Sequence, residues 1–268
     1  MEYDLCIAIR VSPLLSKKHL FFSSKYDMVK TCYSSLLESL KGINFRAIII
    51  LDNCPPNFDD LFYPPNGGDP PEFIRTPGIG NNGTFLMQLD LLERQKYSDL
   101  VFFAEDDYLY IHDLRPLLEF INEGQENPDF VSPYDHPDYY GSEYHRYEKL
   151  YTTHGQQKWK QVGSTTCTFF TSKETLKEAH DIMRQYPHLC DYLMFNLLTR
   201  KNPLLSWMHF RDLYGLAPYS LLVNMLNLRR RTFSLWAPEP SFASHLQQGC
   251  LSPNIDWERY LKLYIQPR

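Results

Sequence analysis

The sequence lacks the features that would assign it directly to several large classes of protein. No apolar stretch reaches about 18 residues, so no segment is predicted to span a membrane. The start, MEYD, has neither the basic residues nor the apolar core of a signal peptide, so we expect a cytoplasmic protein, with contact at the inner face of a membrane left open. Positive charge is not in excess, because the net charge is −5, and nucleic acid is therefore not an expected partner.

Cysteine motifs are also missing. The six cysteines are scattered, with no CxxC pair and no Cys/His spacing of a zinc site. In a chain of 268 residues without a secretion signal they predict reduced thiols. Hydrophobic residues make up 43% and aromatic residues 15% of the chain, which is enough for a sizeable core in one large α/β domain or two small ones.

The first fifty residues carry a strand–helix–strand pattern. Residues 5–9 form an apolar run that predicts a strand, and residues 25–40 carry one apolar stripe at helical spacing. A second apolar run at 47–51 ends in Asp52. This order predicts a βαβ unit with parallel strands and a right-handed crossover.

Three consecutive carboxylates follow another apolar run. Residues 100–104 are apolar without interruption, which is typical of a strand buried on both faces, and Glu105, Asp106 and Asp107 come directly after them. Ligands of open α/β sheets bind at the carboxyl ends of the strands. Neighbouring anions repel one another, and oxygen ligands favour Mg²⁺ or Mn²⁺, so the cluster predicts a metal site. The alternative is an acidic turn in solvent.

A turn rich in glycine and asparagine lies between the two halves of this pattern. A short strand at 73–75 leads to residues 78–84, GIGNNGT, which open a predicted helix. Such a turn leaves backbone N–H groups at a helix N-terminus, where a phosphate or a ribose can bind. It lacks the Gly-Lys-Ser/Thr of a Walker loop, so a plain loop-to-helix turn is an equal alternative.

Other segments are predicted less sharply. Residues 54–72 are rich in proline, glycine, asparagine and aspartate and predict a long loop, and residues 162–170 predict a strand. Residues 133–160 carry many tyrosines and histidines without clean periodicity, which favours a functional loop or lid. Residues 204–210 are strand-like, and the rest of 200–268 has no clear pattern.

With these pieces in place, the chain resembles the nucleotide-sugar-dependent glycosyltransferases of the GT-A fold and is family 2-like. The resemblance rests on the opening that ends in Asp52, on the helix start at 80–84, and on Glu105-Asp106-Asp107, which is similar to a DxD motif in Glu-Asp-Asp form. It covers roughly residues 3–200, with a weaker match at 241–246. It implies an α/β, GT-A-like (Rossmann-like) fold, with a mostly parallel central sheet and helices on both faces.

The resemblance also implies an organisation and an activity. We expect a single catalytic domain over 1–268, with a nucleotide-sugar half at about 1–110 and an acceptor half with a C-terminal extension at about 111–268. The implied reaction moves a sugar from a nucleotide sugar, with a UDP-sugar favoured, to a glycan or glycolipid acceptor, with inversion. The implied cofactor is Mn²⁺ or Mg²⁺.

Residue by residue, the resemblance makes Asp107 and His245 the metal ligands, with His154 as the rival histidine. Asp191 is the implied general base, although a carboxylate in the first turn of a helix explains the same residue. The residues implied to bind the nucleotide sugar, with Asp52 at the nucleobase, are Arg10, Ser12, Asp52, Arg75, Asn82, Gly83, Thr84, Glu105 and Asp106.

Two other functions stay open at this point. A nucleotidyltransferase would share the sheet and the acidic site, but the chain lacks the glycine-rich, basic loop expected after the first strand. A non-catalytic sugar- or nucleotide-binding protein would need no base at Asp191. The run Arg229–Arg231 is most simply a solvated charge cluster, with a diphosphate clamp or an anionic membrane face as alternatives.

Overall fold

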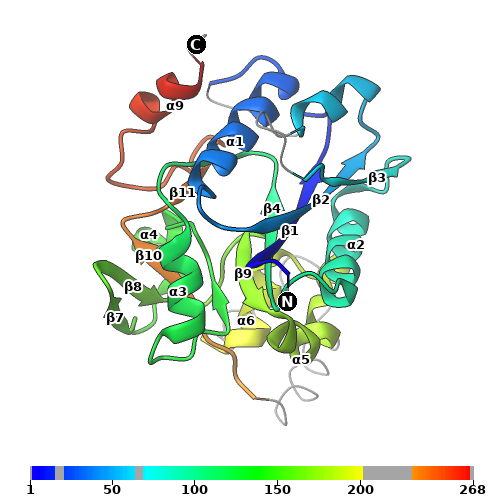
Figure 1. Ribbon diagram of the computed structural model, residues 1–268. Helices are drawn as coiled ribbons and strands as arrows, with labels where there is room; N and C mark the ends of the chain where they lie inside the picture. The colour runs from blue at the N-terminus through cyan, green and yellow to red at the C-terminus, as the bar shows by residue number, and fades with distance from the viewer. Residues whose placement is uncertain (1, 16–20, 64–68, 202–230, 266–268) are drawn as a thin grey trace.

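The computed structural model describes residues 2–15, 21–63, 69–201 and 231–265. Its main sheet has nine strands in the described residues. They are β1 (Leu5–Val11), β2 (Phe45–Asp52), β3 (Glu72–Thr76), β4 (Leu100–Glu105), β6 (Phe130–Val131), β7 (Tyr151–His154), β8 (Gln157–Gln161), β9 (Phe169–Ser172) and β10 (Leu235–Glu239). Their order, β3-β2-β1-β4-β9-β6-β10-β8-β7, runs from right to left in Figure 1.

The direction of the strands confirms the expected sheet. β1 is parallel to both β2 and β4, and β2 is parallel to β3, as the apolar runs predicted. β9 and β8 pair antiparallel with their neighbours on either side, so these two strands oppose the rest. The fold is therefore a mixed α/β fold around a large, mostly parallel sheet.

Helices cover both faces of this sheet (Figure 1). Ile7 and Ile9 of β1 pack with α1 and α3, whereas the alternate residues Cys6 and Ala8 pack with α2, α5 and α6. None of the described helices combines the length and the apolar character needed to cross a membrane. The helices are α1 (Lys25–Ser39), α2 (Gly80–Arg94), α3 (Arg115–Glu123), α4 (Asp138–Gly141), α5 (Lys173–Met183), α6 (Asp191–Thr199) and α9 (Trp257–Ile265), with the 3₁₀ turns η1 (Pro56–Leu61), η2 (Glu143–His145) and η3 (Tyr186–His188).

A second, two-stranded sheet lies at the carboxyl end of β4. It pairs β5 (Tyr108–Tyr110) antiparallel with β11 (Ala243–His245). Beside it, α9 packs on α1 through Trp257, Leu261 and Met28. The C-terminal part of the chain is thereby attached to the region that follows the acidic triplet.

Three segment predictions need correction. Residues 54–72 contain the turn η1, and residues 133–160 contain α4, η2 and the strands β7 and β8 rather than only an irregular lid. The hairpin formed by β7 and β8 is difficult to predict from sequence because β8 also pairs with β10, which comes much later in the chain. Of the strand expected at 162–170, only the end is formed, since β9 begins at Phe169.

Two further predictions fall wholly or partly outside the described residues. These are the strand at 204–210, and Arg229 and Arg230 of the basic run. The third arginine of that run, Arg231, lies at 2.8 Å from Asp129 and at 2.5 Å from Glu178. All six cysteines are free thiols.

Candidate active site

The three carboxylates that follow β4 do not form one common anionic cluster. Each lies against a different basic side chain. The pairs are Glu105–Arg10 at 2.7 Å, Asp106–Lys25 at 2.7 Å and Asp107–His245 at 2.9 Å. Opposite charges at these distances offset the repulsion between adjacent anions, which explains how the chain tolerates the triplet away from bulk water.

Glu105 and Arg10 face each other across the parallel pair β1–β4, because they occupy partnered positions in its register. Arg10 also donates to Asn81 Oδ1 at 2.7 Å, and Thr168 Oγ1 donates to the other oxygen of Glu105 at 3.1 Å. Burial raises the pKa of Glu105, and Arg10 opposes that effect. Glu105 thus ties β1, β4, α2 and the approach to β9 together.

Asp106 connects the end of β1 to the start of α1 in a similar way. One oxygen accepts from Lys25, the first residue of α1, and the other accepts from the backbone N–H of Ser12 at 2.9 Å. The predicted residue Ser12 therefore reaches the site through its backbone. Sequence reasoning missed Lys25, which reads as an ordinary first-turn residue of a helix.

Asp107 meets His245 because β5 pairs with β11. The register places His245 opposite Tyr108, whose ring stacks on the imidazole at 5.0 Å, and Leu246 N donates to Asp107 O at 2.9 Å. Burial would lower the pKa of His245, but the carboxylate of Asp107 raises it to about 10. The rival histidine, His154, lies on β7 with its ring 5.8 Å from that of Phe120.

Cys250, which sequence reasoning did not single out, lies next to His245. Hydrogen bonds from His136 and His245 lower the pKa of Cys250 to about 6, against the effect of burial. The carbonyl oxygen of Cys250 also accepts from the hydroxyl of Tyr134. No local sequence pattern marks Cys250, because two of its partners, Tyr134 and His136, lie in a distant segment of the chain.

The residues present suit a metal that shares its coordination with a ligand. Within the ranges that the structure describes, no three His, Cys, Asp or Glu side chains form a metal-binding group. The candidate donor set is the carboxylate of Asp107 and the imidazole of His245, at 2.9 Å from each other, and His245 would release its proton on binding a metal. Divalent ions such as Mg²⁺ are commonly held by one or two carboxylates and complete their shell with substrate phosphates and water, and Asp107 supplies one such carboxylate here.

Asp52 holds the glycine-rich turn together. Its carboxylate accepts from Thr76 Oγ1 at 2.6 Å, from Ile79 N at 2.7 Å and from Gly80 N at 2.8 Å. Burial acts to raise the pKa of Asp52, but these hydrogen bonds lower it below its ordinary value. Two backbone N–H groups that were expected to be free for a phosphate therefore donate to Asp52 instead. The expected contact from Asp52 to a nucleobase stays a prediction.

The glycines of this turn have distinct structural reasons. Gly78 and Gly80 have φ angles of +103° and +73°, which disfavour any side chain. A Cβ on Gly83 would lie 2.9 Å from Cβ of Ile79. Together they form the spacing G-x-G-x-x-G between β3 and α2, which sequence reasoning overlooked and which alone is a weak signal for a ligand turn.

The remaining residues predicted to bind the donor have mixed environments. Thr84 Oγ1 donates back to Gly80 O at 2.9 Å, and Arg75 donates to Cys54 O at 2.9 Å and pairs with Asp59. Asn82 is exposed, whereas its neighbour Asn81, which was not predicted, contacts Arg10. Direct contact of any of these side chains with a donor stays a prediction.

Asp191 is the first residue of α6 and not its N-cap. The N-cap is Cys190, whose side chain makes no capping bond, and Asp191 Oδ1 accepts from Tyr192 N at 2.8 Å. Asp191 is half-buried and near enough to Glu105 to contribute to the raised pKa of that residue. It therefore lies at the same end of the sheet as the acidic triplet.

Comparison with known proteins identifies the fold. No protein-family model and no curated protein matches the sequence. The solved structure of the galactosyltransferase LgtC in complex with donor and acceptor sugar analogs has a TM-score of 0.50 and 11% identity, over 98% of this chain and 97% of that chain. The glycosyltransferase GlyE of Streptococcus pneumoniae TIGR4 gives 0.45 and 11%, over 97% of this chain and 62% of its own. The likeness to LgtC shows a GT-A-like fold.

Proposed function

We propose that the chain is a metal-dependent glycosyltransferase that moves a sugar from a nucleoside-diphosphate sugar, with a UDP-sugar favoured, to a hydroxyl of a glycan or glycolipid. The observation that carries this proposal is the contact between Asp107 and His245 at the carboxyl end of β4. Parallel α/β sheets bind ligands at that end, and the GT-A-like fold supports the same placement.

The ion pairs prepare this end of the sheet for a diphosphate. Arg10 and Lys25 neutralise Glu105 and Asp106, so those carboxylates do not repel an anionic donor. Asp107 and His245 are then the side chains that hold the metal. When bound, Mn²⁺ or Mg²⁺ supplies Lewis-acid stabilisation of the charge that grows on the leaving diphosphate.

Asp191 is the proposed general base. It accepts the proton of the acceptor hydroxyl as that oxygen bonds to the anomeric carbon and the bond to the diphosphate breaks. An attack from the side opposite the leaving group inverts the anomeric configuration, and a carboxylate within hydrogen-bond reach is needed because an alcohol is a weak nucleophile while protonated. The position of Asp191 at the start of α6, near Glu105, supports this role.

A second candidate is a non-catalytic sugar- or nucleotide-binding protein. It is favoured by one observation, namely that each carboxylate of the triplet already has a basic partner in the protein. A purely structural triplet would show the same pairs. The two candidates differ in whether ligand binding requires a metal.

A thermal-shift screen of UDP-, GDP-, CDP- and dTDP-sugars with and without Mn²⁺ tests the proposal. A donor at 100 times its dissociation constant stabilises the folded state by about 2.7 kcal/mol. We expect one nucleotide class to raise the melting temperature only when Mn²⁺ is present, and the matching sugar to be released or transferred. Equal shifts without metal, with no turnover, favour the binding protein. No shift with any donor contradicts both candidates.

A further inference from the structure

A pocket of about 490 Å³ lies in the segment that the sequence predicted to be a lid. Its volume falls within the usual range of sites for small molecules. Its lining combines aromatic and charged side chains, among them Tyr139, Tyr140, Arg146, Tyr147, Glu148 and Lys149. Tyrosine rings with polar edges are surfaces on which a sugar can pack while its hydroxyls keep hydrogen bonds.

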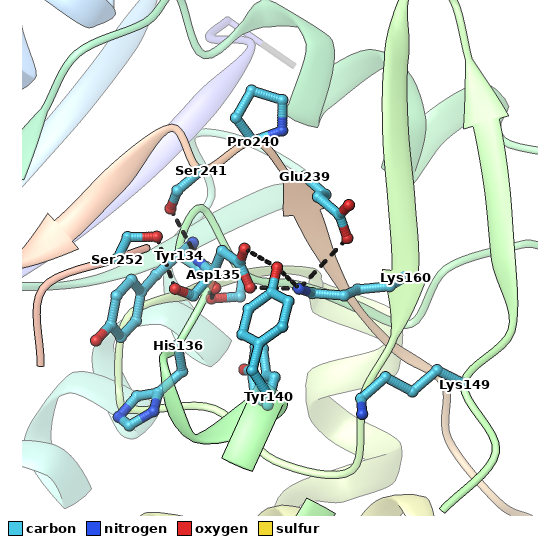
Figure 2. Close-up of polar contacts among 12 residues, drawn as sticks. Tyr134, Asp135, His136, Tyr140, Lys149, Lys160, Glu239, Pro240, Ser241 and Ser252 are labelled. Carbon is cyan, nitrogen blue, oxygen red and sulfur yellow. Dashed lines mark hydrogen bonds and ion pairs between the residues drawn. The ribbon is translucent and has the colours of Figure 1, made fainter. Parts of the chain in front are cut away.

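A buried lysine fixes one wall of this pocket. Lys160 of β8 is 1% exposed and lies 2.5 Å from Asp135, and its ammonium donates to the Tyr140 hydroxyl at 2.6 Å. Tyr140 in turn donates to Asp135 at 2.6 Å, and these contacts form the centre of the cluster in Figure 2. Since buried charges hold their geometry only when paired and hydrogen-bonded, Tyr140 is kept in one position although its side chain is 53% exposed.

Most charged groups of the cluster are paired with one another. Lys160 is paired with Asp135 and lies 3.6 Å from Glu239, and Glu239 is paired with Lys158 at 3.0 Å. Lys149, in the chain before β7, lies below this cluster in Figure 2 and makes no drawn contact with it. Among the described residues, no carboxylate lies within ion-pair distance of Lys149, whose ammonium donates to the carbonyl of His145 at 3.3 Å.

The environment of Lys149 favours an added anion. Burial and the nearby charge of Lys160 lower the pKa of Lys149, and the carboxylate of Asp135 opposes these effects. The other charges of the lining are Arg146, which pairs with Glu143 at 3.6 Å, and the exposed Glu148. An anionic ligand at Lys149 would meet an ammonium that has no ion-pair partner among the described residues.

The wall of the pocket also contacts α6, the helix that begins at Asp191. His145 of its wall lies 6.1 Å, ring to ring, from Tyr192, and Tyr144 lies 5.0 Å from the same ring. Tyr192 follows Asp191 directly in α6. A sugar chain seated in the pocket would therefore lie on the acceptor side of the proposed reaction.

We propose that this pocket binds an anionic sugar unit of the acceptor, with Lys149 at the anion and the ring of Tyr140 against the sugar. The inference rests on the proposed function and adds to it the chemical class of the acceptor. The anion is either the carboxylate of a uronic acid or the phosphate of a sugar phosphate, which present the same charge to Lys149. Both are acceptors for charge-assisted hydrogen bonds from an ammonium.

Calorimetric titration with D-glucuronate, D-glucose 6-phosphate and D-glucose tests this site. We expect the wild-type protein to bind at least one of the two anions more tightly than glucose, and the tighter anion identifies the source of the charge. Lys149→Gln should weaken anion binding about tenfold, the loss expected for one charge-assisted hydrogen bond, and leave glucose unchanged. Lys41→Gln, which removes the same charge from an exposed loop away from the pocket, should bind like the wild type.

Three results overturn the inference: no binding of either anion, equal binding of glucose and the anions, or unchanged anion binding in Lys149→Gln. Titration of UDP with Mn²⁺ on the same samples separates this inference from the proposed function. If UDP binds and the anionic sugars do not, the acceptor class is wrong and the proposed transferase stands. If UDP, GDP, CDP and dTDP all fail to bind in the presence of Mn²⁺, the proposed function is wrong.

Discussion

The three carboxylates of the acidic triplet, Glu105, Asp106 and Asp107, have different roles in this protein. Glu105 and Asp106 join strands and helices through Arg10 and Lys25, and only Asp107 meets a residue that is a common metal ligand. Three neighbouring residues of the same charge are thus placed in three environments by the chain around them. Substitution of each should consequently affect a different property of the protein.

Asp191→Asn separates catalysis from helix stability. If Asp191 is the base, the variant loses transfer by a factor of about 100 or more, while its affinity for the donor is nearly unchanged because the base acts on the acceptor in the transition state. Asp27→Asn is the matched control, since Asp27 is a first-turn carboxylate of α1. Transfer rate and donor affinity measured on both variants decide the matter. Near wild-type transfer by Asp191→Asn removes the base from the account.

Asp52→Asn should show a pH-dependent loss of stability. The pKa of Asp52 is lowered on folding, so its ionised carboxylate stabilises the protein above its ordinary pKa of 3.8 and loses that effect as pH falls through the lower folded value. We expect the variant to be less stable than the wild type by about 2 kcal/mol near pH 7, the scale of hydrogen bonds to a charged group. Urea unfolding at pH 7 and pH 3 measures the difference, which should shrink at the lower pH. A constant difference would show that the charge of Asp52 is not involved.

At the scale of the secondary-structure elements, the start of α2 is tightly packed. Gly83→Ala would place a Cβ 2.9 Å from Ile79 and should cost about 1–3 kcal/mol, as overpacking usually does. Gly141→Ala is the matched control, because no heavy atom lies within 4 Å of its added Cβ. Thermal unfolding of the two variants tests this, and equal melting temperatures would contradict the packing described for the turn.

The predictability of an element depends on whether its signal is local. Residues 100–104 and 47–51 are buried on both faces, so their apolar runs identify β4 and β2 directly. The strand β8 has the sequence QKWKQ, in which only Trp159 and Lys160 are buried. Its stability comes from pairing with β10 and from the stacking of Trp159 on Phe120 at 4.2 Å, and neither contact leaves a periodic pattern in the segment itself.

For the molecule as a whole, the candidate site is assembled from segments far apart in the chain. The acidic triplet could be placed from sequence because a buried strand precedes it, and His245 entered through the resemblance. Lys25, Asn81 and Cys250 could not be placed, because their roles depend on how α1, α2 and the C-terminal segment pack around β4. The fold class was therefore predictable from local patterns, whereas the pairing of each carboxylate required the three-dimensional structure.

The central claim is that Asp107 and His245 hold a metal together with a nucleoside diphosphate. Calorimetric titration of UDP in the presence and absence of Mn²⁺, on the wild type and on Asp107→Asn, tests it most directly. The exposed Asp60→Asn is the matched control for the same chemical change. We predict Mn²⁺-dependent UDP binding in the wild type and in Asp60→Asn. In Asp107→Asn, Mn²⁺-dependent UDP binding should be weaker by more than about 100-fold. Loss of a residue that only hydrogen-bonds to a metal ligand already weakens binding by up to about 100-fold, and Asp107 is proposed to be a ligand itself. UDP binding that is equally tight without Mn²⁺, or unchanged in Asp107→Asn, would contradict the claim.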